Sequence, residues 1–392
     1  MNFIKYLLAL SFLLFNLSSF AISTTAKYAL LIDADTGGII YEKNSNIKMP
    51  PSSMSKLMTV YLAFDQIKNG ALQMNDKVVV SKKAWSKRGS RMFLPLNKEA
   101  TVSDLLHGII VQSGNDASIA IAESIAGSEG AFVNRMNVVS KKIGLNNSSF
   151  ANSTGWPSRN HYMTSVDLAT LANRIIKDYP EYYSYFSQRE FTYNKIRQFN
   201  RNTLINKGLG VDGLKTGHTD KAGYGITASA KRNGRRLILV LNGVNSPTAR
   251  AQEAKTLFQY GFLNFTNVKI ANANLPLISA NVSFGNAKKV DLVPEKDLVF
   301  TVPVEQKNQI QAVVNYKDNL IAPIQKNTKI GTIEITLPNK EKQTFALIAK
   351  TNIAEAGFFQ KSYYKSKGWI GDLFSSVKKE SGMKHKALSI DA

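Results

Sequence analysis

Apolar β-type runs flank a long helical region in the first two-thirds of the chain, and this order constrains the fold more than any other feature. Five such runs lie at residues 28–33, 38–41, 213–216, 224–230 and 237–241. The residues at 34–37 predict a hairpin between the first two runs, and Asn233-Gly234 predicts one between the last two. Strands so far apart in sequence can bury their apolar faces by sharing one sheet. The order therefore predicts an α+β domain over residues 22–265.

Three helical segments are expected within this domain. The first covers residues 53–67 and follows the chain break Pro50-Pro51-Ser52. The second covers 103–145 and is interrupted at 113–115, and the third covers 247–262. We therefore expect helices to fill the middle of the domain, between the strands that share the sheet.

The texture changes after this domain to short β-type runs separated by turns. They lie at residues 290–293, 298–302, 310–316, 333–337 and 344–348. Sustained helical periodicity is missing here, so residues 266–356 are predicted to form a small all-β C-terminal domain. Its sequence suggests no chemistry.

The two ends of the chain have patterns of their own. Lys5, an apolar run and a small-residue segment ending at Ala21 predict a secretory signal peptide over residues 1–21, and an uncleaved anchor is the alternative. Residues 357–380 predict a terminal amphipathic helix with Trp369 and Phe374 on its apolar face and lysines around it. Such a helix suits an anionic membrane surface, although it could also dock on the β domain. Residues 381–392 carry no pattern from which we predict structure.

Composition excludes several kinds of site. The chain has no cysteine, and His107, His161, His218 and His385 lie far apart without acidic ligands at metal-binding spacing, so we expect no metal. The net charge of +22 would suit nucleic acid, anionic lipid or an acidic polymer. Export removes most nucleic-acid roles and leaves the membrane surface and the cell wall.

Three short motifs carry the chemistry. Ser53 and Lys56 form an S-x-x-K motif, and positions three apart share one face of a helix. A buried lysine can become neutral and take the serine proton, while the helix N-terminus favours a developing oxyanion. Ser113-Gly114-Asn115 follows between helices, and Lys215-Thr216-Gly217 stands on a strand that we expect to be central. A lysine on such a strand needs a specific reason.

The order and context of the motifs make them informative, since S-x-x-K and S-x-N both recur elsewhere in the chain. Together with stretches at 89–94, 112–117, 196–202 and 211–224, they resemble the D-alanyl-D-alanine carboxypeptidases. These are low-molecular-mass penicillin-binding proteins of serine peptidase family S11. The resemblance covers essentially the whole mature chain. It implies the penicillin-binding, serine β-lactamase-like transpeptidase fold, which has an antiparallel sheet with helices.

The resemblance also implies roles for individual residues. Ser53 would form an acyl-enzyme with Lys56 as base, and Ser113 and Lys215 would pass a proton to the leaving amine. The substrate would be held by a second set of residues, namely Asn115, Thr216, Gly217, His218 and Arg201. The backbone N–H groups of Ser53 and His218 would form the oxyanion hole. The implied partners are the peptidoglycan stem pentapeptide and β-lactams as covalent inhibitors, at the periplasmic face of the bacterial inner membrane, with no cofactor.

Four alternatives remain open at this point. A serine β-lactamase shares the motifs, but residues 130–180 contain no glutamate to act as the deacylating base. A D,D-endopeptidase of the same family is the nearer alternative. A non-catalytic protein that binds the cell wall or anionic lipid would use the charge alone. A nucleic-acid binder lacks any supporting motif.

Overall fold

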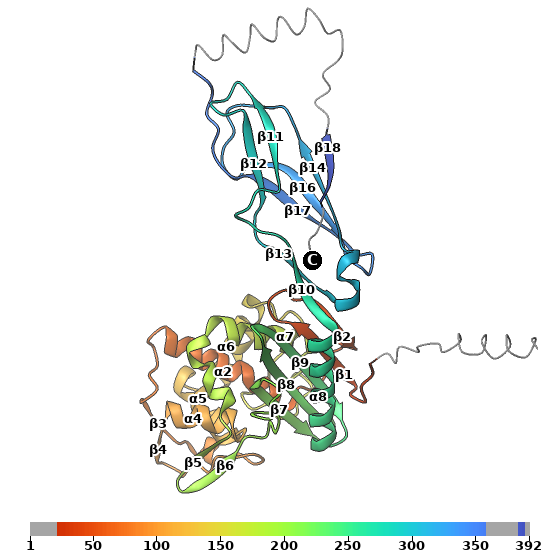
Figure 1. The fold of residues 1–392 in the computed structure, drawn as a ribbon. Coiled ribbons are helices and arrows are strands. Elements are labelled where there is room, and N and C mark those ends of the chain that lie inside the picture. Colours follow the sequence, from red (N-terminus) through yellow and green to blue (C-terminus); the bar gives the residue numbers. More distant parts are fainter. Residues whose placement is uncertain (1–21, 358–382, 389–392) are drawn as a thin grey trace, which may run out of the picture.

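The computed structural model describes residues 22–357 and 383–388 (Figure 1). These residues form an α+β part followed by a β-rich part, as the order of elements predicts. The predicted signal peptide lies outside the described residues. So does the amphipathic helix predicted over 357–380, except for its first residue. Both therefore stay predictions.

A five-stranded antiparallel sheet forms the centre of the α+β part, in the order β2-β1-β9-β8-β7. Its strands are β1 (Tyr28–Asp33), β2 (Ile39–Lys43), β7 (Val211–Thr219), β8 (Gly223–Arg232) and β9 (Arg235–Val244). The first two strands thus join the last three in one sheet. The β8–β9 turn is the predicted one, because Asn233 and Gly234 both have the positive φ that a tight hairpin requires. One prediction is wrong, since β7, which carries Lys215, is an edge strand and not a central one.

Helices cover both faces of this sheet (Figure 1). They are α2 (Lys56–Lys68), α3 (Lys82–Ser86), α4 (Val102–Ile110), α5 (Asn115–Ala126), α6 (Glu129–Lys142), α7 (Ser165–Asp178) and α8 (Pro247–Asn264). Two 3₁₀ segments, η2 (Ser52–Ser55) and η3 (Pro180–Ser187), and two small hairpins, β3 (Lys77–Val79) with β4 (Glu99–Thr101) and β5 (Glu190–Tyr193) with β6 (Ile196–Phe199), complete this part.

Strand β9 is apolar without interruption because both of its faces are buried. Ile238 and Val240 belong to the core on the α2 side, whereas Leu237, Leu239 and Leu241 belong to the core under α8. Side chains alternate between the faces of a strand, so each face contributes to a different core. The sheet is therefore fixed from both sides, and the strand that carries the Lys-Thr-Gly motif belongs to it.

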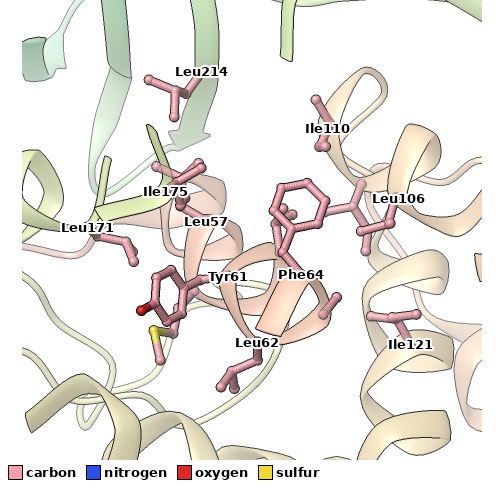
Figure 2. Packing of buried hydrophobic residues seen from close by; sticks show 14 of the residues in the cluster. Leu57, Tyr61, Leu62, Phe64, Leu106, Ile110, Ile121, Leu171, Ile175 and Leu214 are labelled. Atoms are coloured by element: carbon pink, nitrogen blue, oxygen red, sulfur yellow. The ribbon is translucent and has the colours of Figure 1, made fainter. Parts of the chain in front are cut away.

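Helix α2 is the most enclosed helix of this part, and every residue from Lys56 to Phe64 is buried. Figure 2 shows Phe64 facing Leu106 and Ile110 of α4, and Tyr61 near Leu171 of α7. A helix that is apolar on all sides must lie inside a protein. The polar groups between Lys56 and Phe64, the Lys56 amine above all, are therefore removed from water.

The β-rich part contains a seven-stranded sheet in the order β15-β11-β12-β17-β16-β14-β18, and a pair formed by β10 and β13. The bounds are β10 (Phe265–Ala271), β11 (Ile278–Ser283), β12 (Lys289–Pro294), β13 (Leu298–Pro303), β14 (Gln311–Lys317), β15 (Leu320–Ile321), β16 (Lys329–Thr336), β17 (Lys342–Ala349) and β18 (Met383–Leu388), with the 3₁₀ segment η4 (Val304–Gln309) after β13. The sequence predicts five of these strands. It misses β10, β11, β15 and β18, which are polar, very short or both.

A polar junction links the two parts. The Asp33 carboxylate at the end of β1 is fully buried and accepts hydrogen bonds from Arg235 Nε at 2.8 Å and from Asn267 Nδ2 at 3.0 Å. The hydroxyls of Thr36 and Thr301 lie 2.6 Å apart beside it. The Asp33–Arg235 ion pair lies within the α+β part, and the hydrogen bonds of Asn267 and Thr301 tie β10 and β13 to the first hairpin beside it.

Candidate active site

Ser53 and Lys56 lie together, as their spacing predicts, but the local helix is of a different type. Ser53 stands in η2, and the α-helix begins only at Lys56. The 3₁₀ turn brings positions three apart nearly into line along its axis. Lys56 Nζ lies 3.0 Å from Ser53 Oγ, which is within reach for a proton transfer between them.

Lys56 is held in place by two further acceptors. Its Nζ donates to Asn115 Oδ1 at 2.7 Å and to the Thr154 carbonyl at 2.5 Å. The side chain is 0% exposed, and among the described residues no carboxylate forms an ion pair with it. Burial, together with the nearby charge of Arg201, lowers the pKa of Lys56 to about 7. Near neutral pH a large fraction of Lys56 is therefore the free amine that a general base requires.

The second motif, Ser113-Gly114-Asn115, lies where the connection after α4 leads into α5. Ser113 has φ +67 and is 2% exposed, and its Oγ has no hydrogen-bond partner within the described chain. Asn115 begins α5, where its Oδ1 accepts from Lys56 and its Nδ2 donates to the Arg88 carbonyl at 2.8 Å. A buried hydroxyl without a partner that lines a cleft is free to bind an incoming substrate atom.

Strand β7 brings the third motif to the opposite wall. Lys215 is 2% exposed and donates to the Thr216 carbonyl at 3.0 Å. Burial and the charges of Lys56, Arg201 and Arg250 hold the pKa of Lys215 well below its usual value. Gly217 is needed for packing, because a Cβ there would lie 3.0 Å from the Pro51 carbonyl. Because Gly217 has no Cβ atom, η2 can lie directly against β7.

His218 and Arg201 line the same cleft. The His218 ring stacks on Tyr224 with 3.9 Å between the ring centroids. Arg201 stands in the segment before β7, and burial lowers its pKa. All nine residues that the sequence nominates thus lie at or beside one site.

Arg250 is a functional candidate that sequence reasoning misses. It stands in the first turns of α8, is only 6% exposed, and donates to the Arg201 carbonyl at 3.0 Å. Its Nε has no partner among the described atoms, and burial lowers the pKa of Arg250 to about 10. Its position on a predicted helix gives no signal, because only the tertiary structure brings that helix to the cleft.

The cleft has a volume of about 800 Å³, and Ser53 lines it together with two unlike groups of residues. Arg201 and Arg250, joined by a hydrogen bond, form a cationic group with Thr216 that we refer to as the arginine end. Gly89, Gly155 and Trp156 form the second group, in which a Cβ at Gly89 would meet the Trp156 ring. Asp220 carries the only carboxylate among the described lining residues. A substrate with a negative terminus would therefore bind with that terminus at the arginine end.

The described chain offers no set of ligands for a metal ion. Within residues 22–357 and 383–388, His, Asp and Glu side chains nowhere gather in a group of three or more that could hold one. The chemistry available is a serine nucleophile, a neutral amine and buried cations. Together these suit acyl transfer from a substrate that ends in a carboxylate.

Comparison with known protein families gives two matches. Residues 17–246 match the family model described as D-alanyl-D-alanine carboxypeptidase. Residues 265–355 match the model described as penicillin-binding protein 5, C-terminal domain. The first match covers more than half of the chain, and the second covers the β-rich part except for β18.

Individual proteins agree with these matches. The chain is 37% identical over 343 residues to D-alanyl-D-alanine carboxypeptidase DacA of Haemophilus influenzae, which covers 86% of this chain and 87% of that protein. The crystal structure of penicillin-binding protein 5 from the same organism has 36% identity and a TM-score of 0.79, covering 86% of this chain and 99% of that one. Penicillin-binding protein D2 of Listeria monocytogenes in its ampicillin-bound form has 27% identity and a TM-score of 0.57, covering 62% and 99%.

Proposed function

This chain belongs to the D-alanyl-D-alanine carboxypeptidases of peptidase family S11, and from that membership we propose how its residues carry out the reaction. It is a serine enzyme that removes the terminal D-alanine from peptidoglycan peptides. The observation that carries the assignment of residues is the contact of Ser53 with a fully buried lysine whose pKa is lowered to about 7.

In the first step neutral Lys56 takes the proton of Ser53, and Ser53 Oγ forms a bond to the carbonyl carbon between the two terminal D-alanines. The backbone N–H groups of Ser53 and His218 hold the oxyanion. The C–N bond then breaks, and the proton that Lys56 took from Ser53 passes through Ser113 and Lys215 to the departing amine, which leaves Lys56 neutral again. The unpartnered Ser113 hydroxyl supports this role. Water, activated through Lys56, then releases the shortened peptide.

Substrate binding uses both ends of the cleft. Thr216, Lys215 and Arg201 hold the terminal carboxylate, and the buried Arg250 adds a second guanidinium at that end. Asn115 and Gly217 line the path of the peptide backbone, which runs along β7. Because β7 is an edge strand, its outer side can pair with an extended peptide.

A β-lactam places a carboxylate and a strained amide in the same positions, so it acylates Ser53. Hydrolysis of that adduct needs a well-placed base. Asp220 is the single carboxylate among the described cleft residues, and it is exposed. The cleft therefore fits a carboxypeptidase that β-lactams inhibit better than it fits an efficient β-lactamase.

We further propose that the protein is exported and lies on the outer, periplasmic face of the inner membrane. The predicted signal peptide, the charge of +22 and the amphipathic pattern at 357–380 support this location. In the described residues no helix is both long enough and apolar enough to cross a bilayer.

The first test is release of D-alanine from a soluble pentapeptide ending in D-Ala-D-Ala. We expect release by the wild-type protein and a loss of at least about 10³-fold in Ser53→Ala, as for removal of other serine nucleophiles. Labelling by a fluorescent penicillin should disappear in the same variant.

Two results would contradict the proposal in different ways. Labelling that survives in Ser53→Ala would place the nucleophile elsewhere. A folded, labelled wild-type protein that releases no D-alanine but cleaves crosslinked dimers would be an endopeptidase.

A further inference from the structure

A second hollow adjoins the active-site cleft beyond Trp156. It has a volume of about 420 Å³, and Trp156 lines both hollows. Lys87, Arg88 and Ile119 are among the residues that line it. We refer to Lys87, Arg88 and Trp156 as the cationic shelf. Trp156 is 43% exposed there, and Lys87 Nζ lies 4.5 Å from the centre of its ring.

The positive charge of the shelf is not compensated by nearby carboxylates. Glu129 also lines the hollow, but it is bound by Lys83 at 2.7 Å and by the Ser153 hydroxyl at 2.8 Å. Lys87 and Arg88 form no ion pair among the described residues. Two cations beside an aromatic ring therefore face a hollow that has room for a ligand.

The shelf is connected to the reacting atoms by direct contacts. The Arg88 carbonyl accepts from Asn115 Nδ2 at 2.8 Å, and Asn115 Oδ1 accepts from Lys56 at 2.7 Å. The charge of Lys87 also contributes to the lowered pKa of Lys56. The shelf thus lies beside the catalytic centre, next to the part of the cleft that Gly89, Gly155 and Trp156 line.

The direction of the substrate follows from these two ends. In the proposed function, on which this inference rests, the terminal carboxylate lies at the arginine end. The rest of the peptide then extends past Ser53 toward Trp156, at about 3.3–3.6 Å per residue. The residue before D-Ala-D-Ala therefore reaches Trp156, and its side chain reaches the shelf.

We propose that the cationic shelf binds a carboxylate on the side chain of that third residue. The preferred stem peptide carries a diamino dicarboxylic acid at this position and not lysine. The aliphatic part of the side chain packs on the Trp156 ring, and its carboxylate meets Lys87 and Arg88. A lysine side chain carries the same terminal ammonium as the diamino dicarboxylic acid but lacks its carboxylate, so nothing on it would offset the charges of Lys87 and Arg88.

The test compares two pentapeptides that differ only in having diaminopimelic acid or lysine at the third position. Their dissociation constants are measured by calorimetry on full-length Ser53→Ala, so binding is separated from turnover. We expect the dicarboxylic peptide to bind about tenfold more tightly, as two partly exposed ion pairs allow, and the ratio to fall toward one at high salt. In the Ser53→Ala background, Lys87→Gln with Arg88→Gln should abolish the preference.

The matched control is Lys82→Gln, an exposed lysine of α3 that does not line the hollow. It should leave the ratio of the two constants unchanged. Equal binding of both peptides overturns the inference, and so does a preference that survives the double substitution or a failure of both peptides to bind. D-alanine release by the Ser53 protein is measured in parallel. Absence of release there would contradict the proposed function, while the binding ratio would still decide the role of the shelf.

Discussion

At the scale of single residues, the site depends on two lysines that are buried without carboxylate partners in the described chain. Lys56 is 0% exposed and Lys215 is 2% exposed. Desolvation penalises the charged form of a lysine, and each cation disfavours the other. The neutral amine needed at Lys56 is thus a consequence of burial, and Arg201 strengthens it.

This gives a prediction for pH. Acylation of Ser53 requires the neutral amine of Lys56. This amine is protonated below its pKa of about 7 and neutral above it. The rate of penicillin acylation should therefore rise about tenfold per pH unit below that value and level off above it. Stopped-flow measurement with a fluorescent penicillin from pH 5 to pH 9 would show the inflection.

Arg201→Gln provides the control. Arg201 and Lys87 are the two cations that lower the pKa of Lys56, and Arg201 has the larger effect. The inflection should move to higher pH, whatever happens to the height of the curve. An inflection that stays in place would show that the profile reports a different group.

At the scale of elements, the site is built where η2, strand β7 and the loop after α6 come into contact. The loop after α6 passes so near η2 that a Cβ at Gly155 would lie 2.0 Å from the Ser52 carbonyl. The φ of Gly155 is +76, a conformation that other residues adopt only with strain. This loop also supplies the Thr154 carbonyl that holds Lys56.

Gly155→Ala should accordingly displace η2 and its nucleophile. We expect the acylation rate to fall by about 10²-fold, as small displacements of reacting groups do, and stability to fall as well. Gly127→Ala is the matched control, since Gly127 has φ +73 but open space around it. It should lose about 1 kcal/mol of stability from the backbone strain alone and keep its acylation rate. Equal rates in the two variants, followed with labelling and urea unfolding, would refute this account of the loop.

At the scale of the whole molecule, the β-rich part is fixed to the catalytic part by the junction around Asp33 and extends away from it (Figure 1). Strand β18 adds an unexpected tie at the far end of the chain. It pairs with β14, and Lys384 binds the buried carboxylate of Asp318. The predicted amphipathic segment therefore stands between two points, Ala356 and Met383, that belong to the described structure.

This position changes how membrane binding should be tested. Deletion from residue 358 onward would remove β18 as well, so substitution within the segment is the cleaner change. Trp369→Ser with Phe374→Ser should weaken binding to anionic liposomes at least tenfold, because burial of each aromatic side chain contributes about 1.5–3 kcal/mol. D-alanine release from a soluble peptide should not change.

Leu275→Ser is the control for loss of an exposed apolar side chain, since Leu275 is 62% exposed on the β-rich part. Co-sedimentation of the double variant at the wild-type level would exclude the segment as the membrane-binding element.

The sequence by itself determines the order of strands and helices, the hairpin turn at Asn233-Gly234, and the three motifs. These are local properties, because periodicity, turn residues and short spacings act within a few positions. The tertiary structure alone decides that β7 is an edge strand, that Arg250 reaches the cleft, that β18 joins the sheet and that Lys87 and Arg88 lie beyond Trp156. It also decides the lowered pKa of Lys56, since desolvation depends on how many distant segments exclude water from one atom.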